Sequence, residues 1–297
     1  MLVTLKEIVD NAAKNGYAVA APNIFSELDA RAYVEAAEEL NAPVILDVAY
    51  GAHPDIITFG KLVCELARQA SVPVAVSLDH GASMQQVAAA LRAGFTGVML
   101  DCSVLPFEEN VARVREVVEL AHSVGVSVEA ELGHVGQAAN YDIDRNSALT
   151  DVGDACRYIE ATGLDCLAVA IGTAHGAYPK GYQPYLDFER LVQIKAATGG
   201  FPLVLHGSSG TGLEQIRKAC TMGINKVNIA NDLCRAAVDA LKAADLEGQG
   251  AYDVWNVGRN GAKKKLKQMM EIYGSVGKSW CPASPGLPKK AVTLEEK

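Results

Sequence analysis

The sequence has no excess of positive charge, no long apolar run and no signal-like N-terminus. Its 297 residues carry 27 Lys and Arg against 35 Asp and Glu, a formal net charge of −8. Nucleic-acid binding requires a basic surface, so this balance argues against a nucleic-acid partner. No apolar stretch approaches the roughly 20 residues of a membrane-spanning helix, and residues 1–16 carry acidic side chains early and lack an apolar core. We therefore expect no membrane partner.

Paired cysteines and a dinucleotide-binding glycine motif are also missing. The seven cysteines are odd in number and scattered, with no CxxC spacing, which favours reduced thiols in a cytoplasmic protein. No GxGxxG motif follows the first expected strand. Its absence disfavours a doubly wound open sheet, the second fold that the chain length allows.

Short apolar segments alternate with segments of helical periodicity along the chain. Several apolar segments are apolar at consecutive positions, as parallel strands buried on both faces are. One intervening segment runs from Ser83, an expected N-cap, to Gly94, an expected C-cap. The alternation predicts an α/β fold, a single-domain (β/α)8 TIM barrel over residues 1–280 with a C-terminal tail at 281–297. The expected strands are residues 18–22, 44–48, 74–78, 98–100, 126–132, 166–171, 203–205 and 226–229.

Three of the six histidines follow expected strands, at His80, His175 and His206. The carboxyl ends of the strands of a TIM barrel meet at one mouth, where the chemistry of these enzymes takes place. Imidazole nitrogens suit Zn²⁺, and three of them leave a fourth coordination position open. The sequence therefore predicts a zinc site at this mouth. Asp79, beside His80, is positioned for proton transfer.

Further polar residues are expected at the same mouth. Asp101 follows the fourth strand and Glu131 ends the fifth. They are candidates either for ligands of a second metal position or for partners that orient an imidazole ring. The remaining polar residues at the strand ends are Asn23, Asp47, Asn228 and Asn231.

A Gly/Ser-rich turn at residues 206–212 leads into a helix that is expected to start near Leu213. Backbone N–H groups at a helix N-terminus bind anions, and the loops after strands 7 and 8 of a barrel are a frequent phosphate site. The segment from Asn228 to Asn231 offers a second set of donors. A metal beside a phosphate site favours chemistry on a phosphorylated carbonyl compound, whose ketone the metal polarises.

Five segments resemble motifs of the class II fructose-bisphosphate/tagatose-bisphosphate aldolase family, in family order over roughly residues 1–280. They are SLDHGAS (77–83), VEAELGHVG (128–136), AVAIGTAHGAY (168–178), PLVLHGSSG (202–210) and INKVNIANDL (224–233). The resemblance implies zinc at His80, His175 and His206, proton transfer by Asp79, and alternative or second-site metal ligands at Asp101 and Glu131.

The resemblance also implies a substrate and partners. Gly176, Gly207 and Ser209 would belong to loops that bind the phosphate and a monovalent cation, Na⁺ or K⁺. The substrate would be a phosphorylated ketose, and dihydroxyacetone phosphate would be the nucleophilic half. Family members are usually homodimers or homotetramers. The expected activity is therefore that of a zinc-dependent aldehyde-lyase of carbohydrate metabolism.

The sequence departs from the family pattern in places. The loop after strand 5 has Ala138 and Ala139 where acids are expected, including the Glu that removes the donor's C1 proton. Asn256 replaces the Arg that reaches a distal phosphate, with Arg259 nearby. We therefore expect the donor end of the site to be intact and the acceptor end to be altered. The other departures are Ala49 for a Ser, Asn231 for a Thr, and Tyr141, Asp142 and Asp144 as substitute candidates for the missing acid.

Two other functions stay open at this point. A sugar-phosphate-binding barrel with weak or lost catalysis would explain the alanines in the strand-5 loop. A metal-dependent hydrolase on the same barrel would use zinc to activate water. Such sites often have a His-x-His pair at the first strand, whereas strand 1 here ends in Asn23.

Overall fold

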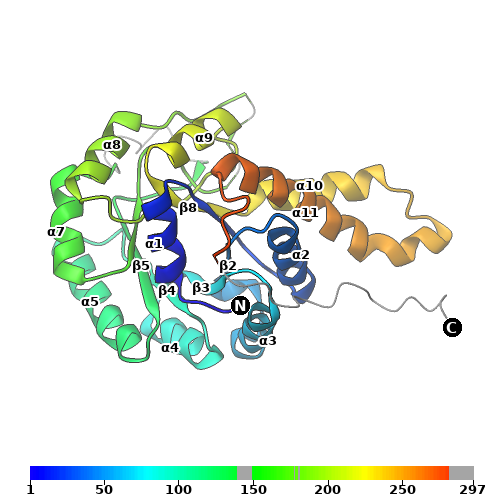
Figure 1. The fold of residues 1–297 in the computed structure, drawn as a ribbon, viewed down its shortest axis with the longest axis horizontal. Helices are drawn as coiled ribbons and strands as arrows, with labels where there is room; N and C mark the ends of the chain where they lie inside the picture. Colours follow the sequence, from blue (N-terminus) through cyan, green and yellow to red (C-terminus); the bar gives the residue numbers. More distant parts are fainter. Residues whose placement is uncertain (139–148, 177, 180, 281–297) are drawn as a thin grey trace.

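A computed structural model of the chain describes residues 1–138, 149–176, 178–179 and 181–280. Eight parallel strands form one sheet in the order β1-β8-β7-β6-β5-β4-β3-β2, and a bridge between Asn23 and Asp47 brings β1 and β2 together. The predicted (β/α)8 barrel is confirmed (Figure 1). The strands are β1 Val19–Pro22, β2 Val44–Ala49, β3 Val74–Gly81, β4 Gly97–Leu100, β5 Ser127–Leu132, β6 Cys166–Val169, β7 Leu203–Leu205 and β8 Ile224–Ile229.

Helices surround the barrel and begin and end at residues that favour those positions. Ser83 accepts a hydrogen bond from the Gln86 amide at the start of α4, and Gly94 ends this helix with φ of 92°, so both expected caps are confirmed. The helices are α1 Leu5–Asn15, α2 Glu27–Glu39, α3 Ile56–Gln69, α4 Met84–Ala93, α5 Phe107–Ser123, α7 Val152–Thr162, α8 Phe188–Ala197, α9 Leu213–Thr221, α10 Asn231–Ala243 and α11 Val254–Tyr273, with short 3₁₀ turns η1 Tyr50–Ala52 and η3 Gly248–Asp253.

The amino ends of the strands are covered by α1. Leu5 is fully buried and contacts Gly97 at the start of β4 so closely that an added Cβ there would lie 2.9 Å from the Cβ of Leu5. The Lys6 amide donates to Ser127 Oγ at the start of β5, at 3.0 Å. Because α1 closes the amino end of the barrel, the carboxyl ends of the strands form its accessible mouth.

The strand boundaries differ from the expected ones at two functional positions. Asp79 and His80 were expected to follow the third strand, but β3 extends to Gly81 and contains both. This difference arises because polar residues at the mouth still pair with the neighbouring strand, which an apolar pattern does not reveal.

Helices α10 and α11 project beyond the barrel (Figure 1). Near the end of this projection, Tyr252 and Trp255 are 80% and 72% exposed. In the part of the chain that the structure describes, no helix is both long and apolar enough to cross a bilayer. The tail at 281–297 lies outside the described residues.

Candidate metal centre and active site

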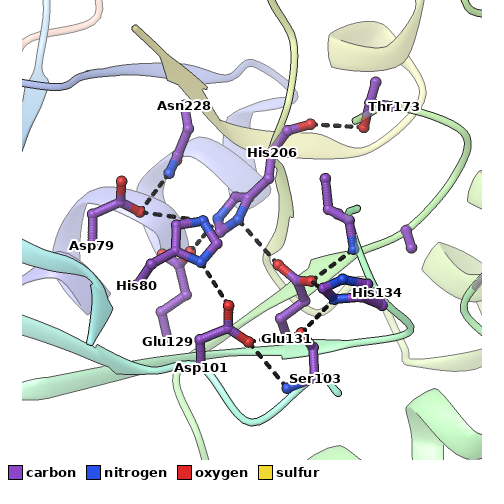
Figure 2. Close-up of polar contacts among 12 residues, drawn as sticks. Asp79, His80, Asp101, Ser103, Glu129, Glu131, His134, Thr173, His206 and Asn228 are labelled. Atoms are coloured by element: carbon purple, nitrogen blue, oxygen red, sulfur yellow. Dashed lines mark hydrogen bonds and ion pairs between the residues drawn. The ribbon is translucent and has the colours of Figure 1, made fainter. Parts of the chain in front are cut away.

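Four side chains converge at the mouth of the barrel. His80, Glu131, His175 and His206 each bring a ligand atom within 4.8 Å of the others. Figure 2 shows the rings of His80 and His206 side by side near Glu131, and their centroids lie 4.7 Å apart in an edge-to-face arrangement. The atoms His80 Nε2, His175 Nε2, His206 Nδ1 and Glu131 Oε2 are buried and meet no hydrogen-bond criterion among the described residues. Within the group, His206 Nδ1 lies 3.2 Å from Glu131 Oε2.

Buried polar atoms without partners are rare because each loses its hydration without compensation. Four that point to one place fit a divalent cation, and three imidazole nitrogens with one carboxylate oxygen form a donor set that suits Zn²⁺. The structure thus brings the three predicted histidines together, and it adds Glu131 to them.

A bulge in β3 lets two consecutive residues face the mouth. The pairing of β3 with β4 shifts register between Leu78 and Gly81, and His80 has φ of 47°, in the left-handed region that non-glycine residues rarely occupy. A Cβ on Gly81 would lie 2.5 Å from the Met99 carbonyl oxygen, so this close approach requires glycine. In a regular strand Asp79 and His80 would point to opposite faces.

Carboxylates orient two of the imidazole rings (Figure 2). His80 Nδ1 lies 2.8 Å from Asp101 Oδ2, and His206 Nε2 lies 2.8 Å from Glu129 Oε1. An ionised carboxylate only accepts hydrogen bonds, so each of these ring nitrogens donates its proton. When the rings are neutral, as a metal requires, the opposite nitrogens, which face the cluster, carry the lone pairs. The structure places Asp101 in this orienting position, beyond the group of converging ligand atoms.

The histidines differ in their affinity for protons. Burial opposes a charge on His206, but its interactions with Glu129 and Glu131 outweigh burial and raise its pKa to about 10. Burial, together with the charges of His206 and His80, lowers the pKa of His175 to about 4. Burial also opposes a charge on His80, but Asp79 and Asp101 outweigh burial and raise its pKa. Of the three histidines, His175 is therefore the one whose neutral form its surroundings favour.

Asp79 is held by two amide side chains. Asn23 Nδ2 donates to Asp79 Oδ2 at 2.8 Å, and Asn228 Nδ2 donates to Asp79 Oδ1 at 2.9 Å. Burial opposes ionisation, but the positive charges of His80 and His206 lower the pKa of Asp79 to about 2. Asp79 is therefore ionised at neutral pH and held in one orientation, and its carboxylate is able to accept a proton from a group in the mouth.

A pocket of about 240 Å³ lies beside Asp79 and His175. Its wall includes every residue that the sequence predicted to bind substrate or phosphate. Ser208 and Ala230 also line it, and sequence reasoning did not single them out. The predicted residues in its wall are Asn23, Gly176, Gly207, Ser209, Asn228 and Asn231.

The turn at Gly207, which the sequence predicted to bind phosphate, owes its shape to a close backbone approach. Gly207 has φ of 63°, and a Cβ there would lie 2.6 Å from the backbone of Ala174. Thr173 Oγ1 donates to the His206 carbonyl at 2.7 Å, which ties the same two loops together. The N-terminus of α10 opens on the pocket at Asn231. Its N-cap residue, Ala230, has no capping side chain, and the Asp232 amide donates to Ser209 Oγ at 3.3 Å. The helix dipole favours an anion at this end.

The start of the strand-5 loop is anchored to the metal-ligand loop. The Ala138 amide donates to the His175 carbonyl at 2.8 Å, and Ala138 is buried against Ala174. A side chain at position 138 therefore faces a small apolar cluster. The substitute candidates Tyr141, Asp142 and Asp144, with Ala139, lie outside the described residues.

The residues considered for a distal phosphate do not line the pocket. Asn256 is exposed on α11, and Arg259 lies 3.4 Å from Glu35 on α2. Among the described residues, the pocket wall contains no lysine or arginine.

Sequence reasoning missed the roles of two charged residues inside the barrel. Glu129 and Lys226 are each 1% exposed and lie 2.8 Å apart. A signal existed, because each is a charged residue within an otherwise buried strand (SVEAEL and INKVNI). Alternate residues of a strand share one face, so Glu129 lies on the same face of its strand as Glu131, and Lys226 on the same face as Asn228.

A histidine–carboxylate cluster at the carboxyl ends of barrel strands is typical of metal-dependent TIM-barrel enzymes. The model of the family "Fructose-bisphosphate aldolase class-II" matches residues 3–278. The chain is 41% identical to a fructose-bisphosphate aldolase of Thermus caldophilus, over 94% of this chain and 100% of that protein. It is 39% identical to one of Geobacillus stearothermophilus, over 94% of this chain and 99% of the relative.

Solved structures agree with the sequence relatives. The YdjI aldolase of Escherichia coli K12 superimposes with a TM-score of 0.84 at 33% identity, covering 94% of this chain and 100% of that one. A fructose-bisphosphate aldolase of Campylobacter jejuni gives 0.79 at 26% identity, covering 94% and 97%. The chain belongs to the class II fructose-bisphosphate aldolase family. It is a metal-dependent aldolase, a lyase, as the motifs predicted.

Proposed function

We propose that this aldolase reversibly cleaves a ketose 1-phosphate or ketose bisphosphate to dihydroxyacetone phosphate and an aldehyde, with Zn²⁺ as its metal. The observation that carries the proposal is a single pocket, lined by every predicted substrate-binding residue, that adjoins both Asp79 and the histidine cluster. His80, His175 and His206, joined by Glu131, would hold the metal. A bound divalent cation supplies positive charge next to the ketose carbonyl oxygen, where negative charge develops.

Asp79 handles the proton of the bond-breaking step. In cleavage, its carboxylate accepts the proton of the hydroxyl that becomes the aldehyde oxygen. The electron pair of the broken C–C bond stays with the fragment that becomes dihydroxyacetone phosphate, and this fragment takes up a proton at that carbon before release. In the reverse direction, the protonated carboxyl returns that proton to the new hydroxyl. Asn23 and Asn228 keep both carboxylate oxygens in place, which aligns Asp79 before the substrate arrives.

The donor's phosphate would bind at the Gly207–Ser209 turn and the start of α10. Backbone amides, the Ser209 hydroxyl and the Asn231 amide supply hydrogen-bond donors there. A Na⁺ or K⁺ ion bound by the loops of Gly176 and Gly207 would offset part of the phosphate charge. The described wall contains the Asp79 carboxylate and no lysine or arginine, which suits one phosphate better than two.

Chelation and borohydride test the reaction class. EDTA is expected to abolish cleavage and added Zn²⁺ to restore it, since the charge at the carbonyl comes from the metal. Borohydride added with substrate is expected to trap no covalent adduct, because no lysine forms a Schiff base in this mechanism. Cleavage that persists after complete metal removal, or a trapped adduct, would contradict the proposal.

Exchange of the C1 proton of dihydroxyacetone phosphate separates the two other functions. The aldolase proposed here exchanges that proton with solvent in the absence of an aldehyde. A metal-dependent hydrolase would bind zinc without this exchange, and a sugar-phosphate-binding barrel would bind the compound without exchange or turnover.

We further propose that the aldehyde partner is not the usual phosphorylated triose. Arg259 is engaged with Glu35 and Asn256 has no charge, so neither supplies the distal phosphate contact. Ketose 1-phosphates are therefore expected to be cleaved with a higher kcat/KM than fructose 1,6-bisphosphate. Fast cleavage of the bisphosphate together with no cleavage of the monophosphates would overturn this substrate assignment.

We also propose that the protein forms a homodimer or homotetramer in the cytoplasm. The exposed aromatic side chains of Tyr252 and Trp255 on the projecting α10–α11 pair support a contact with a second copy, since large exposed apolar groups mark interaction surfaces. Light scattering coupled to gel filtration measures the mass of the assembly directly.

A further inference from the structure

A chain of buried charges crosses the barrel interior next to the histidine cluster. Lys226 on β8 places Nζ 2.8 Å from Glu129 Oε2 on β5 and 3.0 Å from Asp47 Oδ2 on β2. The other oxygen of Glu129, Oε1, lies 2.8 Å from His206 Nε2 (Figure 2). All four side chains are at most 1% exposed. Glu129 thus binds Lys226 through one oxygen and a member of the metal cluster through the other.

The cation determines what Glu129 offers to His206. A carboxylate buried alone would take up a proton, because the interior does not solvate its charge. Lys226 stabilises the ionised form, so Glu129 accepts hydrogen bonds at both oxygens. When His206 is neutral, as a metal ligand must be, its single ring proton then stays on Nε2. The lone pair of Nδ1 is left facing the cluster.

We propose that Lys226 and Glu129 are positioning residues that hold His206 in the tautomer that binds the metal through Nδ1. This inference rests on the metal site of the proposed function. His206 depends on Glu129 more than His80 depends on Asp101, because His206 is 0% exposed whereas the Asp101 side chain is 24% exposed. Water can replace Asp101 beside its ring, but it cannot reach His206.

Glu129→Gln reverses the hydrogen bond while preserving shape. Lys226 is a donor, so it draws the oxygen of the new side-chain amide toward itself and turns the NH₂ group toward His206 Nε2. That nitrogen must then accept, and the ring proton moves to Nδ1, where it blocks the metal. Zinc affinity, measured by competition with a chelator, is expected to fall by about 10–100-fold, the range for partners of metal-bound histidines.

The double variant Glu129→Gln/Lys226→Met separates this effect from general damage. Without the cation, the amide is free to present its oxygen to His206 Nε2, so zinc affinity is expected to recover most of the loss. Asp47→Asn is the matched control, because Asp47 contacts the same lysine but not His206. Its zinc affinity is expected to equal that of the wild type.

Spectroscopy identifies the bound nitrogen without any assay of activity. In cadmium-loaded protein with labelled histidine, one-bond metal–nitrogen coupling is expected at Nδ1 of His206 in the wild type and the double variant. Glu129→Gln is expected to lose that coupling. Unchanged zinc affinity and coupling in Glu129→Gln would overturn the inference, and so would a double variant as weak as the single one. A wild type that binds no zinc would instead refute the metal site itself.

Glu129→Asp provides the test if Glu129→Gln does not fold, as judged by circular dichroism. Aspartate keeps the charge for Lys226 but shortens the side chain by one C–C bond, about 1.5 Å, so it cannot hold both partners at hydrogen-bonding distance. Zinc affinity is expected to fall at least about tenfold. Wild-type affinity in this variant would overturn the inference.

Discussion

Replacing His206 with alanine is expected to remove the metal and the activity together. His206 supplies one of the three nitrogens of the cluster, and its loss also leaves Oε1 of the buried Glu129 without its hydrogen-bond donor. Metal polarisation contributes several kcal/mol to such reactions, so kcat/KM is expected to fall by at least about a thousandfold. Metal analysis of the purified variant and a cleavage assay with added Zn²⁺ measure the two losses.

His122→Ala is the matched control for His206→Ala. His122 also donates to a carboxylate, Asp165, at 2.8 Å, but it lies at the end of α5, outside the histidine cluster. It is expected to keep full zinc content and activity. A His206→Ala protein with wild-type zinc content and cleavage would show that the cluster is not the metal site.

Asp79→Ala is expected to keep the metal and to lose carbon–carbon bond cleavage. Asp79 faces the pocket and is absent from the converging ligand atoms, so zinc content should be unchanged. Loss of a general acid–base costs about 10²–10⁴-fold in rate, and kcat for cleavage is expected to fall by that factor. Asp79→Asn, which keeps the size of the side chain, is expected to lose as much because an amide does not accept the proton.

Proton exchange makes the Asp79 experiment selective. Asp79 acts at the aldehyde oxygen, and a different group removes the C1 proton of dihydroxyacetone phosphate. Exchange at C1 is therefore expected to survive in Asp79→Ala while cleavage does not. Near-wild-type cleavage in this variant would disprove the assigned role, and loss of exchange with retained cleavage would reverse the assignment.

The fold was accessible from the sequence because its signals are local. Buried parallel strands are apolar at consecutive positions, and caps such as Ser83 and Gly94 depend on a few neighbouring residues. The three histidines and the Gly207 turn were equally visible, since any residue that ends a barrel strand reaches the same mouth. Their family motifs extended this to the reaction class, which the comparisons bear out.

The charged residues inside the barrel show where local signals end. Glu129 and Lys226 are far apart in the chain, and nothing near either residue reveals that they form an ion pair. Strand register across the barrel decides this contact. The partner of Arg259 was equally hidden in the sequence, because Glu35 lies on another helix. The packing of these helices keeps Arg259 out of the pocket wall.

The sequence by itself determined the barrel, the three histidines at its mouth and the Gly/Ser-rich turn at residues 206–212, because each depends on periodicity or on short motifs. Only the tertiary structure decided how they lie relative to one another. The bulge at His80 turns Asp79 and His80 toward one mouth, and the contact of Gly207 with Ala174 brings the Gly/Ser-rich turn beside the loop of His175. These arrangements depend on distances between strands that are remote in the chain, and a linear pattern does not contain those distances.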